Sequence, residues 1–287
     1  MGPRLSAAIA GPAAAIACAS ALICAPAALA DTTSSSNWAG YGAHGTGVSF
    51  RSAQGTWRQP DMTCTSGVKT YSSYWVGLGG YSVTSKALEQ IGTEADCSAG
   101  QARLSAWYEL VPSPSMPIQL TIVPGDLMTA TVTVSGPRVT VSLIDLTRKH
   151  SFTKTVSAAT IDVSSAEWIV EAPSECVSAN ACETLPLANF GTAAFSSALA
   201  SSSAGVSGGI AAPAWQTTKI KLVPATRRFI SAGSPAPSVA VATPSALGAN
   251  GRSFTVAYSE VPVTIASRFF AKQSSTLTAG QLLHPTR

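Results

Sequence analysis

The sequence predicts an all-β protein built from short strands, arranged as a sandwich or a barrel. Short segments with alternating apolar and polar residues recur along the chain, and this alternation has the period of half-buried strands. Ser, Thr, Ala, Val and Gly dominate the composition, and 18 Pro and 23 Gly separate the segments as turn residues do. Because no long amphipathic helix pattern is present, we expect β-structure throughout.

Ten segments have the pattern of strands, with Gly, Pro or Asp turns between them. They are residues 56–60, 73–79, 88–92, 103–110, 118–125, 128–136, 138–146, 167–172, 218–223 and 253–261. The best helical candidate is 189–203, and residues 224–248, rich in Pro, Ala and Ser, are expected to form a long surface loop. We therefore expect one β-domain over residues 31–263, followed by a C-terminal tail over 264–287.

Residues 1–30 have the features of a secretory signal peptide. Arg4 supplies a positive charge, an Ala-rich apolar stretch follows, and a small-x-small triplet predicts cleavage after Ala30. A lipid-modified Cys18 or Cys24 is the alternative, although the residues before each fit a lipoprotein signal poorly. No later stretch is long and apolar enough to span a bilayer. We expect a secreted, extracellular protein.

The cysteines predict disulfides rather than a metal site. Four remain after cleavage of the signal: Cys64, Cys97, Cys176 and Cys182. An even number in an exported protein favours disulfides, and four cysteines permit three connectivities. The short spacing favours a Cys176–Cys182 bridge, which leaves Cys64 to pair with Cys97. Without a CxxC pair or clustered His, no zinc site is expected.

The charge pattern argues against nucleic-acid binding. Only 11% of the residues are charged, and the formal net charge is +4. The basic residues form no run, and Arg148-Lys149-His150 is interpreted as a solvated turn. Since few groups titrate, little charge repulsion develops on acidification, which is compatible with acid tolerance.

Four strings place polar groups on one face of predicted strands: 74–80, 87–92, 105–110 and 166–173. Side chains two residues apart on a strand share a face. The polar face holds Trp75, Gly77, Gly79, Leu88, Gln90, Gly92, Glu94, Trp107, Glu109, Glu167, Ile169 and Glu171. The opposite face holds Val76, Ile91, Tyr108, Leu110, Trp168 and Val170, which suit a core. Single glutamates on a strand are usually just solvated, but Trp, Gly and Glu together predict a groove for an extended ligand.

These strings resemble the glutamic peptidases, or eqolisins. The matching strings are Ser35-Ser36-Asn37-Trp38-Ala39-Gly40, Trp75-Val76-Gly77-Leu78-Gly79-Gly80, Glu89-Gln90-Ile91-Gly92, Ala106-Trp107-Tyr108-Glu109 and Ala166-Glu167-Trp168-Ile169-Val170-Glu171. A small disulfide loop after the last string is similar to the Cys176 and Cys182 segment, and residues 185–190 continue the pattern. The matches run in order over residues 35–190.

The resemblance implies a lectin-like or jelly-roll sandwich of two antiparallel sheets, with the active site in a groove on a concave face. It also implies an endopeptidase that acts at acidic pH and uses no cofactor or metal. Catalytic Glu171 would take a proton from the attacking water and return it to the leaving amine. Catalytic Gln90 would donate an amide N–H to the developing oxyanion, and it stays neutral at every pH, unlike a histidine.

The predicted groove also gives expectations for supporting residues and partners. Glu94, Glu109 and Glu167 are expected on the substrate side of the groove or behind the catalytic pair, while Trp75 and Trp107 are expected as groove walls. The expected partners are protein and peptide substrates. We expect no nucleic acid, no stable membrane association, and a monomer.

Two positions depart from the family pattern. Gly79 stands where the family has Asp in its Trp-Val-Gly-Ile-Asp-Gly string, and Glu94 stands where it has Asp. One groove carboxylate is therefore missing, which bears on substrate preference, groove rigidity and working pH. Only residues 31–36 separate the predicted cleavage site from Asn37. We therefore expect control by pH rather than by a sizeable propeptide.

Three other functions stay open from the residues alone. A non-catalytic lectin-like module that binds carbohydrate or peptide would also use a Trp-lined groove. A glycosidase could pair Glu109 with Glu167 or Glu171. A serine hydrolase lacks a Gly-x-Ser-x-Gly elbow here, and pepsin-like chemistry lacks its Asp-Thr/Ser-Gly string.

Overall fold

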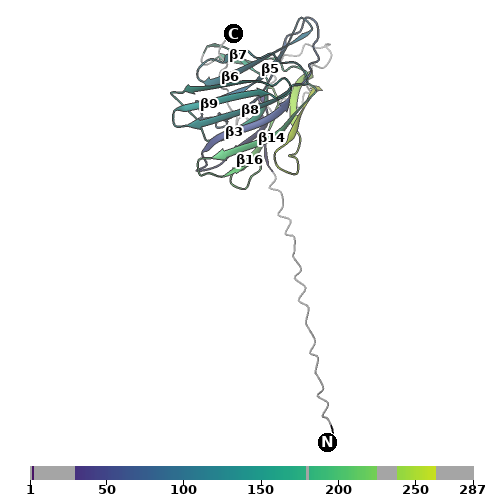
Figure 1. Ribbon diagram of the computed structural model, residues 1–287. Helices are drawn as coiled ribbons and strands as arrows, with labels where there is room; N and C mark the ends of the chain where they lie inside the picture. Colours follow the sequence, from purple (N-terminus) through teal and green to yellow (C-terminus); the bar gives the residue numbers. More distant parts are fainter. Residues whose placement is uncertain (1, 3–29, 179–180, 225–237, 263–287) are drawn as a thin grey trace.

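The computed structural model describes residue 2 and residues 30–178, 181–224 and 238–262, and every regular element among them is a strand (Figure 1). The strands are β1 (Asp31–Ser35), β2 (Trp38–His44), β3 (Phe50–Arg58), β4 (Thr70–Gly79), β5 (Leu88–Ser98), β6 (Gln101–Val111), β7 (Met116–Ile118), β8 (Leu127–Ser135), β9 (Arg138–Asp145), β10 (His150–Ser157), β11 (Ser165–Glu171), β12 (Ser174–Ser178), β13 (Ala181–Thr184), β14 (Thr192–Ser202), β15 (Ser207–Gly208), β16 (Gln216–Leu222), β17 (Ser238–Pro244) and β18 (Phe254–Pro262). In this part of the chain, no helix has the length and hydropathy needed to cross a membrane.

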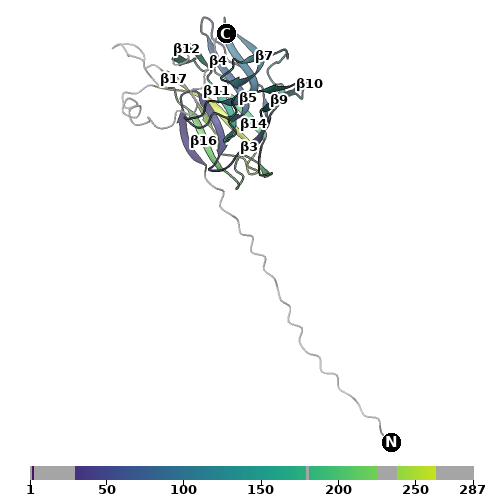
Figure 2. The same cartoon turned by 90° about the vertical axis from the view of Figure 1, so that its left-hand side faces the viewer.

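All the strands except β12 and β13, which form a separate two-stranded sheet, belong to one continuous hydrogen-bonded ladder that folds back on itself as a sandwich. Its order is β10-β9-β8-β3-β14-β18-β17-β16-β2-β11-β4-β5-β6-β7. All neighbours on this path are antiparallel, and β1 adds to β16 in parallel. β3, β8 and β9 contact β4, β5 and β11 across the interior, so the two halves of the ladder lie face to face. The predicted two-sheet antiparallel sandwich is confirmed, and Figure 2 shows β9 and β10 on the opposite side from β16 and β17.

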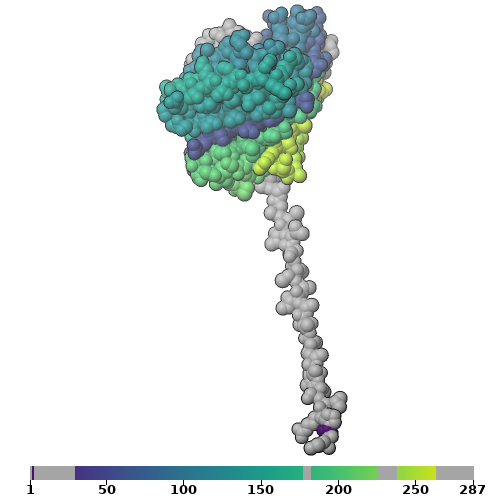
Figure 3. All heavy atoms as spheres, viewed as in Figure 1, coloured from purple at the N-terminus to yellow at the C-terminus, as the bar shows by residue number. Residues whose placement is uncertain are grey.

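The main core lies between the two layers and follows the period of two. Val76, Ile91, Tyr108, Trp168 and Val170 all point into it, as the alternation predicts. On β8 and β9 every second residue is buried in the same core, while the residues between them face outward. Figure 3 shows that outward surface, with β8 to β10 above the band of β3 and the green band of β14 below. The layer that contains β4, β5 and β11 has a second face, which points away from this core, and the predicted polar residues lie on that face.

Two sequence-based expectations about elements are wrong. Residues 118–125 were expected as a strand, but β7 ends at Ile118 because the chain then crosses from one layer to the other. The helical candidate 189–203 is instead the strand β14. A register shift between Ser196 and Leu199, with Ser197 at φ 52°, changes which residues face inward. This bulge interrupts the alternation and conceals the strand.

The described residues include only part of the chain ends and of the Pro-rich region. β17 begins at Ser238, so the predicted surface loop 224–248 contains a strand in its second half. The predicted signal peptide and the tail 264–287 lie outside the described residues, apart from Gly2 and Ala30. The domain boundaries therefore stay predictions.

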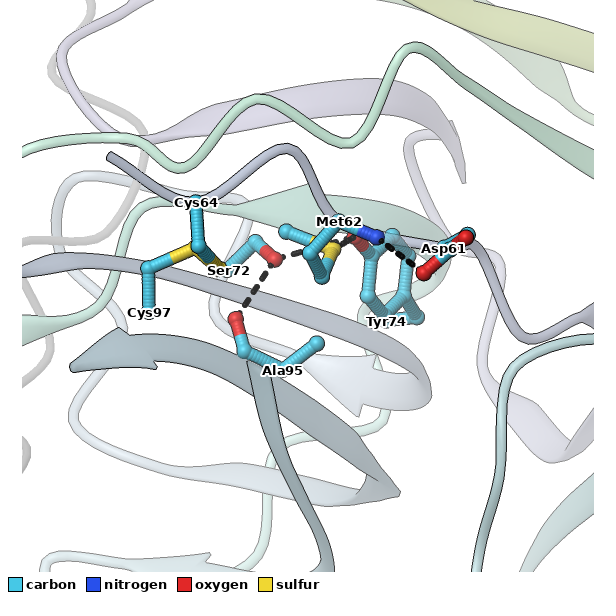
Figure 4. Close-up of a disulfide and its surroundings, with 7 residues drawn as sticks. All are labelled: Asp61, Met62, Cys64, Ser72, Tyr74, Ala95 and Cys97. Carbon is cyan, nitrogen blue, oxygen red and sulfur yellow. Dashed lines mark hydrogen bonds between the residues drawn. A yellow bond between two sulfur atoms is a disulfide. The ribbon is translucent and has the colours of Figure 1, made fainter. Parts of the chain in front are cut away.

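Both predicted disulfides are present. Cys64–Cys97 ties the segment after β3 to the end of β5, beside Ser72 and Tyr74 of β4 (Figure 4). Ser72 Oγ donates to the Ala95 carbonyl at 3.0 Å, so the same edge is also held by hydrogen bonds. Cys176–Cys182 closes the β12–β13 hairpin directly after β11. The two bridges thus brace one end of the strands that carry the predicted polar face.

Candidate active site

The predicted polar side chains gather on the outward face of the β2-β11-β4-β5-β6 sheet. Because directly paired residues on neighbouring strands share a face, the register assigns each one. A second apolar cluster sits among them: Trp38, Trp75, Leu88, Trp107, Val111, Ile169 and Ile220. The sequence predicted four of these, Trp75, Leu88, Trp107 and Ile169, on this face. The site is thus a set of polar groups embedded in an apolar layer.

One ladder row contains Glu167, Gly77, Gln90 and Glu109, here called the Gln90 row. Its three polar side chains are at most 2% exposed. Gln90 Nε2 donates to Glu109 Oε2 at 2.6 Å, a charge-assisted length that fixes which way the amide points. Gln90 Oε1 and both carboxyl oxygens of Glu167 are buried and have no hydrogen-bond partner among the described residues. Gly77 keeps the backbone between Glu167 and Gln90 free of a side chain.

A second row contains Glu171, Ser73, Glu94 and Ser105, here called the Glu171 row. Trp75 Nε1 donates to Glu171 Oε2 at 2.7 Å, and Asn37 Nδ2 donates to Glu171 Oε1 at 3.1 Å. Asn37 is held in turn by Ser35 Oγ, which donates to Asn37 Oδ1 at 3.0 Å. Two N–H donors on separate oxygens hold the carboxylate in one orientation.

Ser35 and Asn37 are site residues that the sequence reasoning missed. They lie in the 35–40 string that resembles the glutamic peptidases, which was the available signal. β1 places them, because it pairs with β16 from Asp31↔Thr218 to Ser35↔Leu222. The N-terminal strand therefore supports the Glu171 carboxylate through Ser35 and Asn37.

Gln90 and Glu171 lie on the same face, with β4 between their strands. Gln90 pairs with Gly77 and Glu171 neighbours Ser73, so their backbones are offset by four residues, about 13 Å of strand. The row between them holds Trp75 and Gly92. A Cβ on Gly92 would lie 2.7 Å from the Trp75 Cβ, so glycine lets this indole sit in the layer. Trp75 is fully buried between the two rows and acts as a hydrogen-bond donor.

A groove of about 690 Å³ opens beside the Glu171 row. Ser73 and Glu94 of that row line it, together with Trp107. The lining also includes apolar and aromatic side chains and several charged ones, among them Tyr71, Leu104, Pro117, Leu185, Lys69, Asp96, Arg103 and Glu175. Its size and mixed lining suit several residues of an extended chain. Trp75 is not among the lining residues, since it lies below the surface.

Three acids meet where β4 and β5 join the loop before β11. Burial raises the pKa of Glu89 to about 9, and it raises the pKa of Glu167 well above its usual value. The nearby Ser165 hydroxyl lowers the pKa of Glu167, but by less than burial raises it. The Ser165 hydroxyl does not form a hydrogen bond of normal geometry with the Glu167 carboxyl. Burial would also raise the pKa of Asp162, but hydrogen bonds from Ser85, Ser164 and Gly80 outweigh it and lower that pKa. The charge of this group therefore resides on Asp162.

Asp162 also occupies the space beside Gly79. A Cβ on Gly79 would lie 2.6 Å from the Asp162 Cβ and 3.0 Å from its carboxyl carbon, and Gly79 has a φ of +82°. A side chain at position 79 is thus excluded by both sterics and backbone conformation. Asp162 thus places a carboxyl group directly beside position 79.

The described residues contain no group of three or more His, Cys, Asp or Glu arranged to hold a metal ion. The polar row and the groove instead present buried carboxyls, an amide and N–H donors. This set can hold a water molecule, donate to a developing oxyanion and transfer a proton.

Comparisons with known proteins identify the family. Residues 36–232 match the Peptidase A4 family. Scytalidoglutamic peptidase with a transition state analog inhibitor is similar at 23% identity and a TM-score of 0.61, covering 78% of this chain and 98% of that one. SCP-B, a member of the Eqolisin family solved with the tripeptide Ala-Ile-His, is similar at 24% identity and a TM-score of 0.56, with the same coverage. Among curated proteins, none matches the sequence. The chain belongs to the Peptidase A4 family.

Proposed function

We propose that this protein is a secreted endopeptidase that cleaves proteins at acidic pH, with Glu171 as the general base and acid and Gln90 as the oxyanion donor. The observation that carries the proposal is that Glu171 and Gln90 lie on one buried face and are held by different hydrogen bonds. Glu171 receives N–H donors from Trp75 and Asn37, whereas Gln90 is fixed by Glu109 with a second amide proton left to donate.

The donors from Trp75 and Asn37 orient the Glu171 carboxylate, which acts as the general base on water. In the first step Glu171 accepts a proton from water as the oxygen attacks the peptide carbonyl. The carbonyl oxygen becomes an oxyanion, and the Gln90 amide stabilises it. Glu171 then gives the proton to the leaving nitrogen, so the C–N bond breaks and the carboxylate is regenerated.

The groove beside the Glu171 row supports an extended polypeptide substrate. Trp107 and Tyr71 offer flat apolar surface, while Glu94 and Arg103 offer polar contacts along its length. Such a site binds a stretch of main chain rather than one terminal residue, which is why internal cleavage is proposed.

The disulfides and the N-terminal strand support export. Two disulfides are typical of proteins outside the reducing cytosol. β1 begins at Asp31, directly after the proposed cleavage site at Ala30. The mature N-terminus can therefore enter the sheet as soon as the signal peptide leaves. This favours activity without a sizeable propeptide, with control by pH.

The test uses the secreted mature protein, incubated with an unfolded protein and, separately, with polysaccharides between pH 2 and 7. Products are identified by mass spectrometry for wild type, Glu171→Gln and Gln90→Ala, with exposed Glu183→Gln as the matched control. Internal peptide cleavage in acid that both site variants lose supports the proposal. Cleavage of polysaccharide, or no cleavage by folded wild type, would refute it.

A further inference from the structure

We propose that Glu167 is a positioning residue for Gln90: its neutral carboxyl donates a hydrogen bond to Gln90 Oε1, directly or through one water, and so aims the amide protons. This role rests on the proposed function of Gln90. It gives Glu167 a specific task and explains why a buried glutamate lies in the same row.

The geometry places the two side chains opposite each other. Glu167 pairs with Gly77, and Gly77 pairs with Gln90, so their backbones are two strand spacings apart, about 10 Å. Each of these side chains can reach about half that distance. Gly77 presents no Cβ, and the atoms nearest to that empty position are the Glu89 carbonyl oxygen, Trp75 Cζ3 and Leu88 Cδ1, at 3.0 to 3.2 Å.

The buried polar atoms without hydrogen-bond partners favour a contact between Glu167 and Gln90. Glu167 is fully buried, Gln90 is 2% exposed, and the two carboxyl oxygens of Glu167 and Oε1 of Gln90 lack partners among the described residues. Leaving a buried polar atom unpaired costs about 1–3 kcal/mol, so three such atoms on side chains of one ladder row favour a bond or a shared water between them. Since Gln90 Nε2 already donates to Glu109, its Oε1 needs a donor.

To donate this hydrogen bond, directly or at the end of a chain through one water, the Glu167 carboxyl must be protonated. Burial and the nearby carboxyls of Asp162 and Glu89 all raise the pKa of Glu167 and keep it neutral. The same face also carries Glu109, which accepts from Gln90 Nε2. Tyr81, whose ring covers Gly42 beside Glu167, and His44, which stacks on Tyr81, lie on the other flank. With Asp162 carrying the charge of the cluster, Glu167 keeps its proton well above the pH at which a glutamate usually loses it.

The locked amide explains the direction of the second N–H. With Oε1 accepting from Glu167 and one Nε2 proton bonded to Glu109, the amide cannot flip without breaking both bonds. The remaining proton then keeps a fixed direction for an oxyanion, which is the preorganisation that such donors require.

The first experiment uses NMR to follow the ionisation of the Glu167 carboxyl and the environment of the Gln90 amide, independently of catalysis. In protein with ¹³C-labelled Glu carboxyls and Glu171→Gln to stop self-digestion, the Glu167 signal is identified by its loss in Glu167→Gln. We expect no ionisation of this signal from pH 3 to 7. We also expect the Gln90 side-chain amide signal, identified with Gln90→Ala, to shift in Glu167→Ala and to stay in place in Glu183→Gln.

Kinetics in the otherwise wild-type protein complete the test. Glu167→Gln keeps a neutral donor, so kcat/KM should stay within about 3-fold of wild type, while Glu167→Ala should lower kcat about 10- to 100-fold. Ionisation of Glu167 near its usual pH, or equal losses in the Gln and Ala variants with folded protein, would overturn the role. If wild type cleaves nothing, the proposed function fails, yet the two NMR measurements still report on the Glu167–Gln90 contact.

Discussion

Replacing Glu89 with glutamine removes a buried acid that makes the fold less stable as the pH rises. Glu89 lies on β5 beside Gln90 but faces the core, where it pairs with Leu78 and Leu110 and is fully buried. Burial raises its pKa from the usual 4.5 to about 9. Between these two pH values the folded protein keeps a proton that the unfolded chain has lost.

The size and sign of the effect follow from this difference in bound protons. Stability changes by about 1.4 kcal/mol per pH unit for each such proton, and it falls as pH rises because the folded state binds more. From pH 4.5 to 7, Glu89 alone should lower the free energy of unfolding by about 3 kcal/mol. Glu167, whose pKa is also raised, adds to the fall. His44, whose pKa is lowered by burial, opposes this loss of stability below pH 6.5. The effects of Glu167 and His44 are the same in the Glu89→Gln variant and its parent, so they cancel in the comparison.

The assay is urea unfolding followed by tryptophan fluorescence at pH 4.5, 5.5, 6.5 and 7, with the disulfides intact. All proteins carry Gln90→Ala to prevent self-digestion. The loss of stability from pH 4.5 to 7 should be about 3 kcal/mol smaller with Glu89→Gln, while exposed Glu183→Gln should follow the parent. Parallel pH profiles for Glu89→Gln and the parent would refute the reasoning.

Three further predictions test the site and its braces. Trp75→Phe keeps a buried aromatic ring but removes the donor to Glu171, the proposed catalytic carboxylate, so kcat/KM on an acid-cleaved peptide should fall about 10- to 100-fold with unchanged circular dichroism. Gly79→Asp should destabilise the protein by more than about 2 kcal/mol in urea, because of its φ of +82° and the clash with Asp162. Adding Asp162→Ala should recover part of that loss, and full stability of the single variant would contradict the packing. Replacing Cys64 and Cys97 with Ala opens a 33-residue loop and should cost about 3–4 kcal/mol, seen by calorimetry as a lower Tm.

The alternation of side chains made the faces of the site predictable. Trp168 and Val170 point to the core and Glu167 and Glu171 to the site face because strand geometry permits little else. The pairing of Gln90 with Glu109 follows from the short β5–β6 hairpin, which fixes the register. These parts depend on local rules, so the sequence contains them.

The rest depends on contacts between distant segments. Asp162 lies 83 residues after Gly79, and no local pattern indicates that a loop residue fills the space beside it. Asn37 reaches Glu171 only because β1 and β2 lie beside β16 and β11. The bulge at Ser197 likewise depends on pairing with β3. It interrupts the alternation in β14, where a helix was predicted over 189–203.

The degree of burial also differs from the sequence-based picture of an open groove. Trp75 was expected as a wall, and it lies beneath the surface because Gly92 admits its indole into the layer. The groove instead opens at the Glu171 row, past Trp107. Glycine positions can be read in a sequence, but which neighbour fills the space that they leave cannot.

The most direct test of the catalytic assignment is kcat/KM between pH 2 and 7 on an internally quenched peptide, for wild type, Glu171→Gln, Gln90→Ala and Glu167→Gln. We predict an acidic optimum, a loss of at least about 10³-fold for Glu171→Gln, a loss of about 10²–10³-fold for Gln90→Ala, and near-wild-type activity for Glu167→Gln. An active Glu171→Gln beside an inactive, folded Glu167→Gln would contradict this assignment and make Glu167, in the row of Gln90, the catalytic base.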